Sequence, residues 1–295
     1  MNREKQKMNK DKKDTPLIGG HVSTAGGLYV SVANAMAIGA NVMQIFGSSP
    51  RMWHARIPHK DEVKIYRAHI ENSSIQAVYL HAAYLVNLAS ASSEIYGKSV
   101  KSLIDHLSIA EMIGAEGLIF HVGSSKGMDR KKAFTQQAVG MKEVLKNVSG
   151  KTKLIMENTA GGGEKIGGTI DEIANLYSQV NSSRVTICFD TAHAFESGLI
   201  ESYTPGNIKN LFDEFDKKIG IDNLSVFHIN DSKTVCNSHH DRHENIGEGY
   251  IKLDGFRELA KEKRIINKPW ILEVPGFEGN GPDRKNIDIL KNLFK

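Results

Sequence analysis

The amino-acid sequence predicts an α/β protein with a single domain, folded as a (β/α)₈ TIM barrel. Short apolar runs rich in β-branched residues recur eight times, and stretches with helical spacing separate them. This alternation implies right-handed crossovers and a parallel sheet, and eight units favour a closed barrel over an open sheet. The length of 295 residues fits, since such barrels commonly form one domain of ~250 residues.

The expected strands share a short length and a nearly continuous apolar character. They are expected at residues 17–22, 41–46, 76–80, 117–121, 153–157, 184–190, 224–229 and 269–273. Runs of this kind are typical of strands that are buried on both faces, as in a parallel sheet.

The stretches between the strands carry apolar residues at helical spacing. Residues 28–38 present Val32 and Ala35 on one face, and residues 102–113 end before Gly114, a residue that often stops helices. Further helices are expected at residues 133–148, 169–180, 208–219, 253–262 and 286–294.

Composition and charge limit the kinds of protein that this sequence can encode. Residues 1–15 are rich in Lys and read as a disordered lead-in to the barrel domain at 16–295, with a basic arm touching nucleic acid as the alternative. The net charge of +4 is compatible with a polyanionic partner. Two cysteines, Cys188 in a core strand and Cys236 in a loop, indicate no disulfide framework and favour a cytoplasmic location. The sequence shows no signal peptide and no apolar run of ~18 residues, so we expect no membrane span.

Histidine and carboxylate residues stand at or near the ends of the expected strands. They are His21, His81, His121, Glu157, Asp190, His193, His228 and Glu273, with Asp241 and His243 in the loop after the seventh strand. In a (β/α)₈ barrel the C-terminal strand ends form one rim, where active sites lie. We therefore expect these side chains to converge on one cavity.

The residue types indicate a metal site. Imidazole and carboxylate together suit Zn²⁺ and similar divalent ions, and this set exceeds what one tetrahedral ion needs. Two or three ions with bridging carboxylates would suit phosphoryl displacement by activated water. A single histidine at a strand end is more often a packed residue, but buried Asp and Glu are rarely without a partner. The set therefore predicts a metal-dependent hydrolase.

Other polar features have plainer interpretations. The histidines away from strand ends are expected to be structural or at the surface, although His239 and His240 could compete with His243 as ligands. This group comprises His54, His59, His69, His106, His239 and His240. The glycine-rich run at 161–168 has no P-loop pattern, and we interpret it as a flexible loop that opens the next helix, with a DNA-backbone contact as the alternative.

Nine segments, taken in order, are similar to those of a known family. They are GHVSTAGG (20–27), HAAYLVNL (81–88), FHVGS (120–124), MENTAG (156–161), CFDTAHA (188–194), FHINDSK (227–233), DRH (241–243), GEG (247–249) and ILE (271–273). From about Ile18 onward the chain resembles the endonuclease IV family of apurinic/apyrimidinic (AP) endonucleases. It departs from the family at Val122, where relatives often have Pro, and at Val274, where Thr is common. Neither is a ligand position.

The resemblance implies three Zn²⁺ ions per chain, with Mn²⁺ as a substitute. The first ion would take His81, His121 and Glu157; the second Glu157, Asp190, His228 and Glu273; the third His193, Asp241 and His243. His21 would lie beneath the site in hydrogen-bonding contact. Glu157 and Glu273 would be catalytic, holding and orienting the nucleophile.

The resemblance also implies residues that insert into DNA. These are Arg51, near Trp53, and the pair Tyr84 and Leu85. An abasic site lacks a base, so unstacking it costs less and a side-chain wedge can fill the gap. The plainer alternatives are a surface cation for Arg51 and ordinary packing for Tyr84 and Leu85.

The expected activity is that of a deoxyribonuclease IV (phage-T4-induced)-type AP endonuclease in base excision repair. It would cut double-stranded DNA on the 5′ side of abasic sites, leaving a 3′-hydroxyl and a 5′-deoxyribose phosphate, and it would also trim blocked 3′ ends. We expect a monomer. The alternatives are a sugar isomerase or epimerase on the same barrel, and a non-catalytic DNA-damage binder with structural metals.

Overall fold

Eight parallel strands form a closed barrel in the computed structural model, which describes residues 16–49 and 51–295. The strands are β1 (Ile18–His21), β2 (Val42–Phe46), β3 (Ala77–His81), β4 (Gly117–His121), β5 (Lys153–Glu157), β6 (Val185–Asp190), β7 (Leu224–His228) and β10 (Trp270–Leu272). They follow one another around the barrel in chain order, and β1 closes it by pairing with β10. The predicted TIM barrel is confirmed. The predicted tail, residues 1–15, lies outside the described residues.

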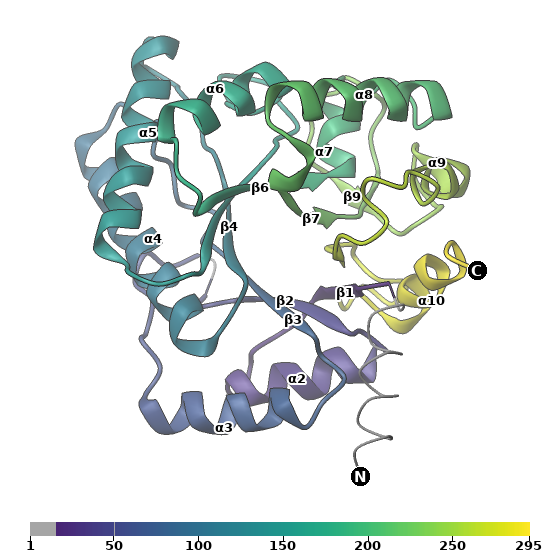
Figure 1. Ribbon diagram of the computed structural model, residues 1–295, viewed down its shortest axis with the longest axis horizontal. Helices are drawn as coiled ribbons and strands as arrows, with labels where there is room; N and C mark the ends of the chain where they lie inside the picture. The colour runs from purple at the N-terminus through teal and green to yellow at the C-terminus, as the bar shows by residue number, and fades with distance from the viewer. Residues whose placement is uncertain (1–15, 50) are drawn as a thin grey trace.

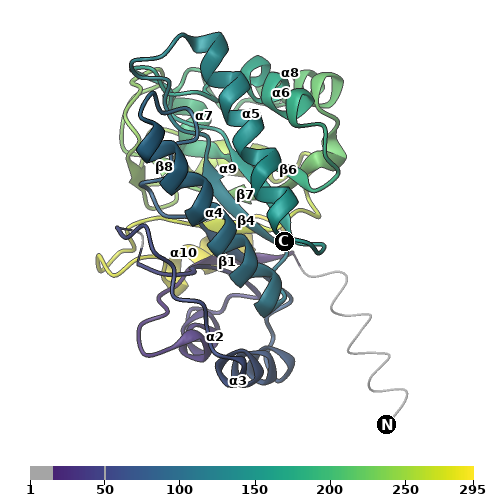
Figure 2. The same ribbon diagram turned by 90° about the vertical axis from the view of Figure 1, so that its left-hand side faces the viewer.

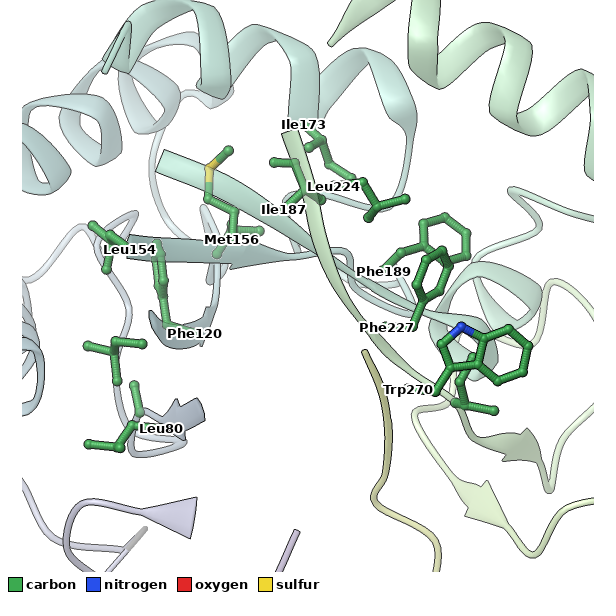
Figure 3. Close-up of a cluster of buried hydrophobic side chains, with 14 of the residues drawn as sticks. Leu80, Phe120, Leu154, Met156, Ile173, Ile187, Phe189, Leu224, Phe227 and Trp270 are labelled. Atoms are coloured by element: carbon green, nitrogen blue, oxygen red, sulfur yellow. The ribbon is translucent and has the colours of Figure 1, made fainter. Parts of the chain in front are cut away.

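Helices surround the barrel (Figures 1 and 2). They are α2 (Leu28–Ala37), α3 (Lys60–Glu71), α4 (Ser93–Ile113), α5 (Arg130–Asn147), α6 (Ile170–Val180), α7 (Thr191–Glu196), α8 (Pro205–Lys218), α9 (Lys252–Leu259) and α10 (Arg284–Asn292). Their inner faces bury apolar residues against the outward side chains of the strands, such as Phe189, Phe227 and Trp270 (Figure 3). Within the described residues, no helix has the length and apolarity that a membrane span requires.

A separate apolar layer fills the barrel interior. It consists of Val42, Tyr79, Ile119, Ile155, Cys188, Val226 and Ile271, one from each of seven strands. The eighth strand, β1, contributes Gly19 at the equivalent position, where a Cβ atom would lie 1.6 Å from the backbone oxygen of Val42. Cys188 is fully buried in this layer, as expected from the sequence.

This interior layer positions the functional site. Side chains two residues apart on a strand point to the same face, so the next inward residues form a second layer at the C-terminal rim. The second layer comprises His21, Gln44, His81, His121, Glu157, Asp190, His228 and Glu273. Two residues along each strand, the barrel interior therefore changes from apolar side chains to polar side chains that are mostly ionisable.

A small two-stranded ribbon stands over this rim. Strand β8 (Asp231–Ser232) pairs in antiparallel fashion with β9 (His243–Glu244). The segment between them, residues 233–242, is called the ligand loop below because it carries Asp241 and leads directly into His243.

Candidate metal centre

The predicted ligands come together in three overlapping groups of side chains. They are His81, His121 and Glu157; Glu157, Asp190, His228 and Glu273; and Asp190, His193 and His243. Within each group, one potential ligand atom from every residue lies within 4.8 Å of the others. The first two groups match the predicted sets in full, and the third contains Asp190 where the prediction has Asp241.

Asp241 nevertheless faces the third group. Its Oδ2 lies 3.3 Å from Nε2 of His193, and its Oδ1 lies 3.7 Å from Nε2 of His243. Its side chain is 36% exposed, whereas that of Asp190 is fully buried. The third group therefore has one carboxylate below it and one at the rim of the cleft.

Glu157 lies at the centre of the cluster. Its Oε2 is 3.1 Å from Nε2 of His81 and 3.2 Å from Nε2 of His121, and its Oε1 is 2.9 Å from Nδ1 of His228. Burial alone would raise the pKa of this carboxyl, but the imidazoles of His228 and His121 outweigh burial and hold its pKa well below the usual range. Glu157 is therefore ionised and reaches two groups at once, as a bridging ligand must.

The outward ring nitrogens of three histidines are held by hydrogen-bond partners. Nδ1 of His81 lies 2.8 Å from the backbone oxygen of the next residue, and Nδ1 of His193 lies 2.9 Å from the backbone oxygen of Asn158. Nε2 of His228 lies 2.7 Å from Oε1 of Gln44. A proton on each of these nitrogens leaves the other nitrogen free to coordinate, which is how metal-binding histidines are usually oriented.

Two buried nitrogens test whether this set fits metal ions. Nε2 of His193 and Nε2 of His243 are buried and have no hydrogen-bond partner in the described part of the chain. The first faces Asp241 across 3.3 Å, and the second faces Asp190 across 3.7 Å. Because buried polar atoms without partners are costly, and because nitrogen and oxygen donors suit Zn²⁺ and Mn²⁺, the residues present fit divalent ions.

Three amide side chains that the sequence reasoning missed hold the carboxylates in place. Nε2 of Gln44 donates to Oε1 of Glu273 at 2.5 Å. Nδ2 of Asn230 donates to Oδ2 of Asp190 at 2.7 Å, while its Oδ1 accepts from the backbone N–H of Glu273 at 2.7 Å. Asn158 accepts from the backbone N–H of Asp190 at 2.6 Å. The available signal was the polar Gln44 inside an otherwise apolar strand.

His21 lies beside this cluster, where a hydrogen-bonding contact was predicted. Its Nδ1 is 2.9 Å from Nε2 of Gln44 and 3.4 Å from Oε1 of Glu273. Burial lowers the pKa of His21, although Glu273 acts in the opposite direction. A neutral ring here accepts from the amide and adds no charge to the cluster.

Comparison with known proteins identifies the family to which this chain belongs. The family model described as a xylose isomerase-like TIM barrel matches residues 32–293. A protein of Halothermothrix orenii named "Probable endonuclease 4" is 34% identical over 93% of this chain and 99% of its own length. The protein of Solibacter usitatus with the same name is 36% identical over 94% and 96%. The chain belongs to the endonuclease IV family.

Solved structures agree with this assignment. The crystal structure of endonuclease IV from Thermus thermophilus has a TM-score of 0.82 and 32% identity, covering 94% of this chain and 98% of its own. A D-tagatose 3-epimerase-like protein has a TM-score of 0.71 at 18% identity, and this likeness concerns the fold alone. Membership of the endonuclease IV family makes this chain an enzyme of the hydrolase class, as the motifs predicted.

A cleft opens beside the cluster, next to the residues predicted to contact DNA. Tyr84 and Leu85 are 61% and 37% exposed, and both line a cavity of about 350 Å³ that also reaches His121 and Asp241. The Tyr84 ring lies 6.0 Å from the ring of His121, between centroids. Partial desolvation against the cluster, together with the nearby carboxylates of Glu273 and Glu157, raises the pKa of Tyr84 to about 12, so its ring is uncharged. Arg51 is exposed in the segment between β2 and α3.

The six remaining histidines do not join the three groups. His54, His59, His69 and His240 are exposed, and His106 is buried against the backbone oxygen of Ser102. His239 points Nδ1 at the backbone oxygen of Ala160, 3.2 Å away, and packs on the glycine-rich run. That run opens α6, whose first turn is capped by Thr169.

Proposed function

We propose that this enzyme hydrolyses the phosphodiester on the 5′ side of an abasic site in double-stranded DNA, leaving a 3′-hydroxyl and a 5′-deoxyribose phosphate. The observation that carries the proposal is the position of three overlapping ligand groups, which share Glu157 and Asp190, at the side of a cleft lined by Tyr84 and Leu85. The curated relatives are named endonuclease 4. The same site would trim blocked 3′ ends.

Three divalent ions would be held by the predicted ligands. These are His81, His121, Glu157, Asp190, His193, His228, Asp241, His243 and Glu273. Bound Zn²⁺ or Mn²⁺ would supply a nucleophile at neutral pH and stabilise charge on the phosphate and leaving oxygens. The side chains of the protein would position the nucleophile and the DNA relative to these ions.

Of the two glutamates proposed to be catalytic, Glu273 is the one that the substrate can reach. Its side chain is 16% exposed, whereas Glu157 is fully buried. Burial would raise the pKa of Glu273, but the imidazole of His228 holds it well below the usual range. A permanently ionised carboxylate is a poor proton acceptor, so its proposed part is to hold and orient the nucleophile beside the phosphate. Gln44 and Asn230 fix it for this purpose.

Lesion recognition would use the exposed residues of the rim. The uncharged ring of Tyr84 and the side chain of Leu85 present an apolar surface beside the cluster. The gap at an abasic nucleotide can accept such a wedge, because one stacked base is already missing. Arg51 would contact the DNA from the neighbouring loop.

The test is a nicking assay on a labelled duplex that carries one tetrahydrofuran abasic analogue. One nick on the 5′ side of the lesion, with a 3′ end that a polymerase extends, is expected. The activity should disappear after prolonged chelation and return with Zn²⁺ or Mn²⁺. Binding without cleavage by the folded, zinc-supplied protein would instead favour a damage-binding protein. No binding and no cleavage would favour an aldose or ketose substrate.

A further inference from the structure

The ligand loop, residues 233–242, is fastened to α7, the helix that carries His193. Asp241 and His243 reach the third ligand group only through this loop and the strand that follows it. The loop leaves the barrel rim after β8, and its carboxylate at Asp241 is more than one-third exposed. The position of Asp241 therefore depends on what anchors the surrounding backbone.

The main anchor is the carboxylate of Glu196, the last residue of α7. Three donors converge on its Oε1: the hydroxyl of Ser232 at 2.8 Å, the hydroxyl of Thr234 at 3.3 Å and the backbone N–H of Arg242 at 3.2 Å. The first two lie where the ligand loop begins, and the third lies between Asp241 and His243. One buried oxygen thus ties both ends of the loop to the same point.

The backbone of α7 anchors the middle of the loop. The carbonyl oxygen of Glu196 accepts from the N–H of His239 at 2.9 Å, and that of Phe195 accepts from the N–H of Asn237 at 3.1 Å. Asn237 and His239 both have positive φ angles, 58° and 59°, so the loop turns sharply at these contacts. His239 also packs on Gly162, where a Cβ atom would lie 2.6 Å from that of His239.

A buried carboxylate at this position lowers the stability of the protein unless its hydrogen bonds compensate. Glu196 is fully buried, and its Oε2 has no hydrogen-bond partner among the described residues. A buried polar atom of this kind costs stability. An apolar side chain would remove that cost but would leave the N–H of Arg242 without its acceptor, and the hydroxyl of Ser232 would keep only the backbone oxygen of Thr234.

We propose that Glu196 is a positioning residue for the third metal ion: by accepting hydrogen bonds from both ends of the ligand loop, it holds Asp241 and His243 opposite His193. It touches neither the ion nor the DNA. The proposal rests on the proposed function for the existence of that ion. The acceptor oxygen, and not the negative charge, is the feature that the geometry requires.

The experiment compares Glu196→Ala with Glu196→Gln. Glutamine keeps an acceptor oxygen, and alanine removes it. Glu111→Ala is the matched control, because Glu111 also accepts backbone N–H groups, from Lys151 and Thr152, but at a loop before β5 on the opposite end of the barrel. Two quantities are measured: amide hydrogen exchange of the ligand loop in metal-free protein, and zinc content after gel filtration.

In Glu196→Ala we expect faster exchange throughout the ligand loop and a third ion bound about 10–100-fold more weakly, the usual effect of removing an outer partner of metal ligands. Glu196→Gln should restore both quantities to near the wild-type values. Glu111→Ala should change neither. If Glu196→Ala does not fold, Ser232→Ala removes one donor alone and should loosen the loop partially.

Wild-type exchange and full zinc content in Glu196→Ala would overturn the proposal, and so would equal damage in Glu196→Ala and Glu196→Gln. The proposed function fails separately. If the wild-type protein neither nicks abasic DNA nor retains zinc, yet Glu196→Ala loosens the ligand loop in the metal-free protein, the anchoring role stands without the nuclease.

Discussion

Glu157 and Glu273 belong to the same ligand group but differ in what surrounds them. Glu157 is fully buried between imidazoles of three strands, whereas Glu273 is partly exposed and fixed by the amides of Gln44 and Asn230. A buried carboxylate shared by two groups suits a structural bridge. A partly exposed and rigidly held one suits contact with the reacting phosphate.

Glu273→Gln is therefore expected to keep the fold and lose at least ~10²-fold in single-turnover nicking, the size of a key electrostatic contribution to catalysis. The change removes the charge and keeps the shape. Thermal unfolding checks the fold, and a labelled abasic duplex reports the rate. The control is Glu262→Gln, because Glu262 pairs with Arg264 and is not among the metal-ligand groups. Near-normal nicking by Glu273→Gln would refute the role.

Tyr84→Ala and Leu85→Ala test the wedge. Each should weaken binding to an abasic duplex by about 1–3 kcal/mol, or ~5–150-fold, the size of the loss when a side chain that stacks on a base is cut back to alanine. Binding to an undamaged duplex should change less, because an intact stack leaves no gap to fill. Val139→Ala, a similarly exposed apolar residue on α5, should leave both affinities unchanged. Equal losses on both duplexes would contradict lesion-specific insertion.

The stability of the folded protein is expected to depend on pH through Glu196. Burial raises its pKa to about 7, although the Ser232 hydrogen bond and His193 act against burial. The folded state therefore holds this proton more tightly than the unfolded chain, whose carboxyl has the ordinary value near 4.5. Its contribution to stability is full below about pH 4.5 and is lost as the pH rises through about 7.

In metal-free protein, the unfolding free energy of the wild type relative to Glu196→Gln should accordingly fall between about pH 5 and pH 8. Urea unfolding at several pH values measures this difference. A difference that stays constant over the range would mean that Glu196 does not titrate there.

At the scale of elements, β1 can pair closely with β2 only because the residue at position 19 has no side chain. Gly19 occupies the interior layer, and a Cβ atom there would lie 1.6 Å from the backbone oxygen of Val42 on the neighbouring strand. Gly19→Ala must push β1 away from β2 and should cost about 3 kcal/mol or more, beyond the usual range for overpacking. Urea unfolding measures the cost.

Gly97→Ala provides the contrast. Gly97 is exposed within α4, and a Cβ atom added there would have nothing within 4 Å. Alanine should stabilise this helix by about 0.5–1 kcal/mol, because it restricts the unfolded chain and favours helix. Destabilisation of similar size in both variants would show that the close approach of β1 and β2 is unimportant.

The strands could be predicted from sequence because they are buried on both faces, and every predicted boundary lies within one residue of the structure. Two helices could not. Helix α3 buries only Tyr66 and so has a weak apolar stripe, and α7 is a six-residue helix that begins directly after β6. The first turns of α4 were also missed, since residues 93–98 are mostly exposed and include Gly97.

The ligands were predictable for a related reason: the barrel brings every C-terminal strand end to one rim, whatever the sequence separation. The residues that hold the ligands were not. Gln44 contacts His228 across 184 positions, and Glu196 contacts Ser232 across 36. Nothing local to Gln44 or Glu196 specifies these partners, because the contacts exist only once the barrel has closed.

At the scale of the whole molecule, the cluster places many ionisable groups directly next to the apolar interior of a closed barrel. Carboxylates of four residues and imidazoles of five meet above the interior apolar layer. Imidazole nitrogens and carboxylate oxygens in this cluster lie only 2.9–3.9 Å apart, in the geometry of ligands to shared ions. Ions that bind the folded state alone would therefore stabilise the entire barrel.

Metal removal is expected to lower the melting temperature as well as abolish nicking. A ligand present at 100 times its dissociation constant adds about 2.7 kcal/mol to the stability of the state that binds it. Protein treated with a chelator and then freed of it should melt at a lower temperature, and addition of Zn²⁺ or Mn²⁺ should restore both melting and activity. Because the ligands come from the ends of most barrel strands and from the segments beyond them, the shift should appear as one cooperative transition of the whole barrel. An unchanged melting temperature, together with full nicking in chelator, would rule out a structural and catalytic part for metal in this site.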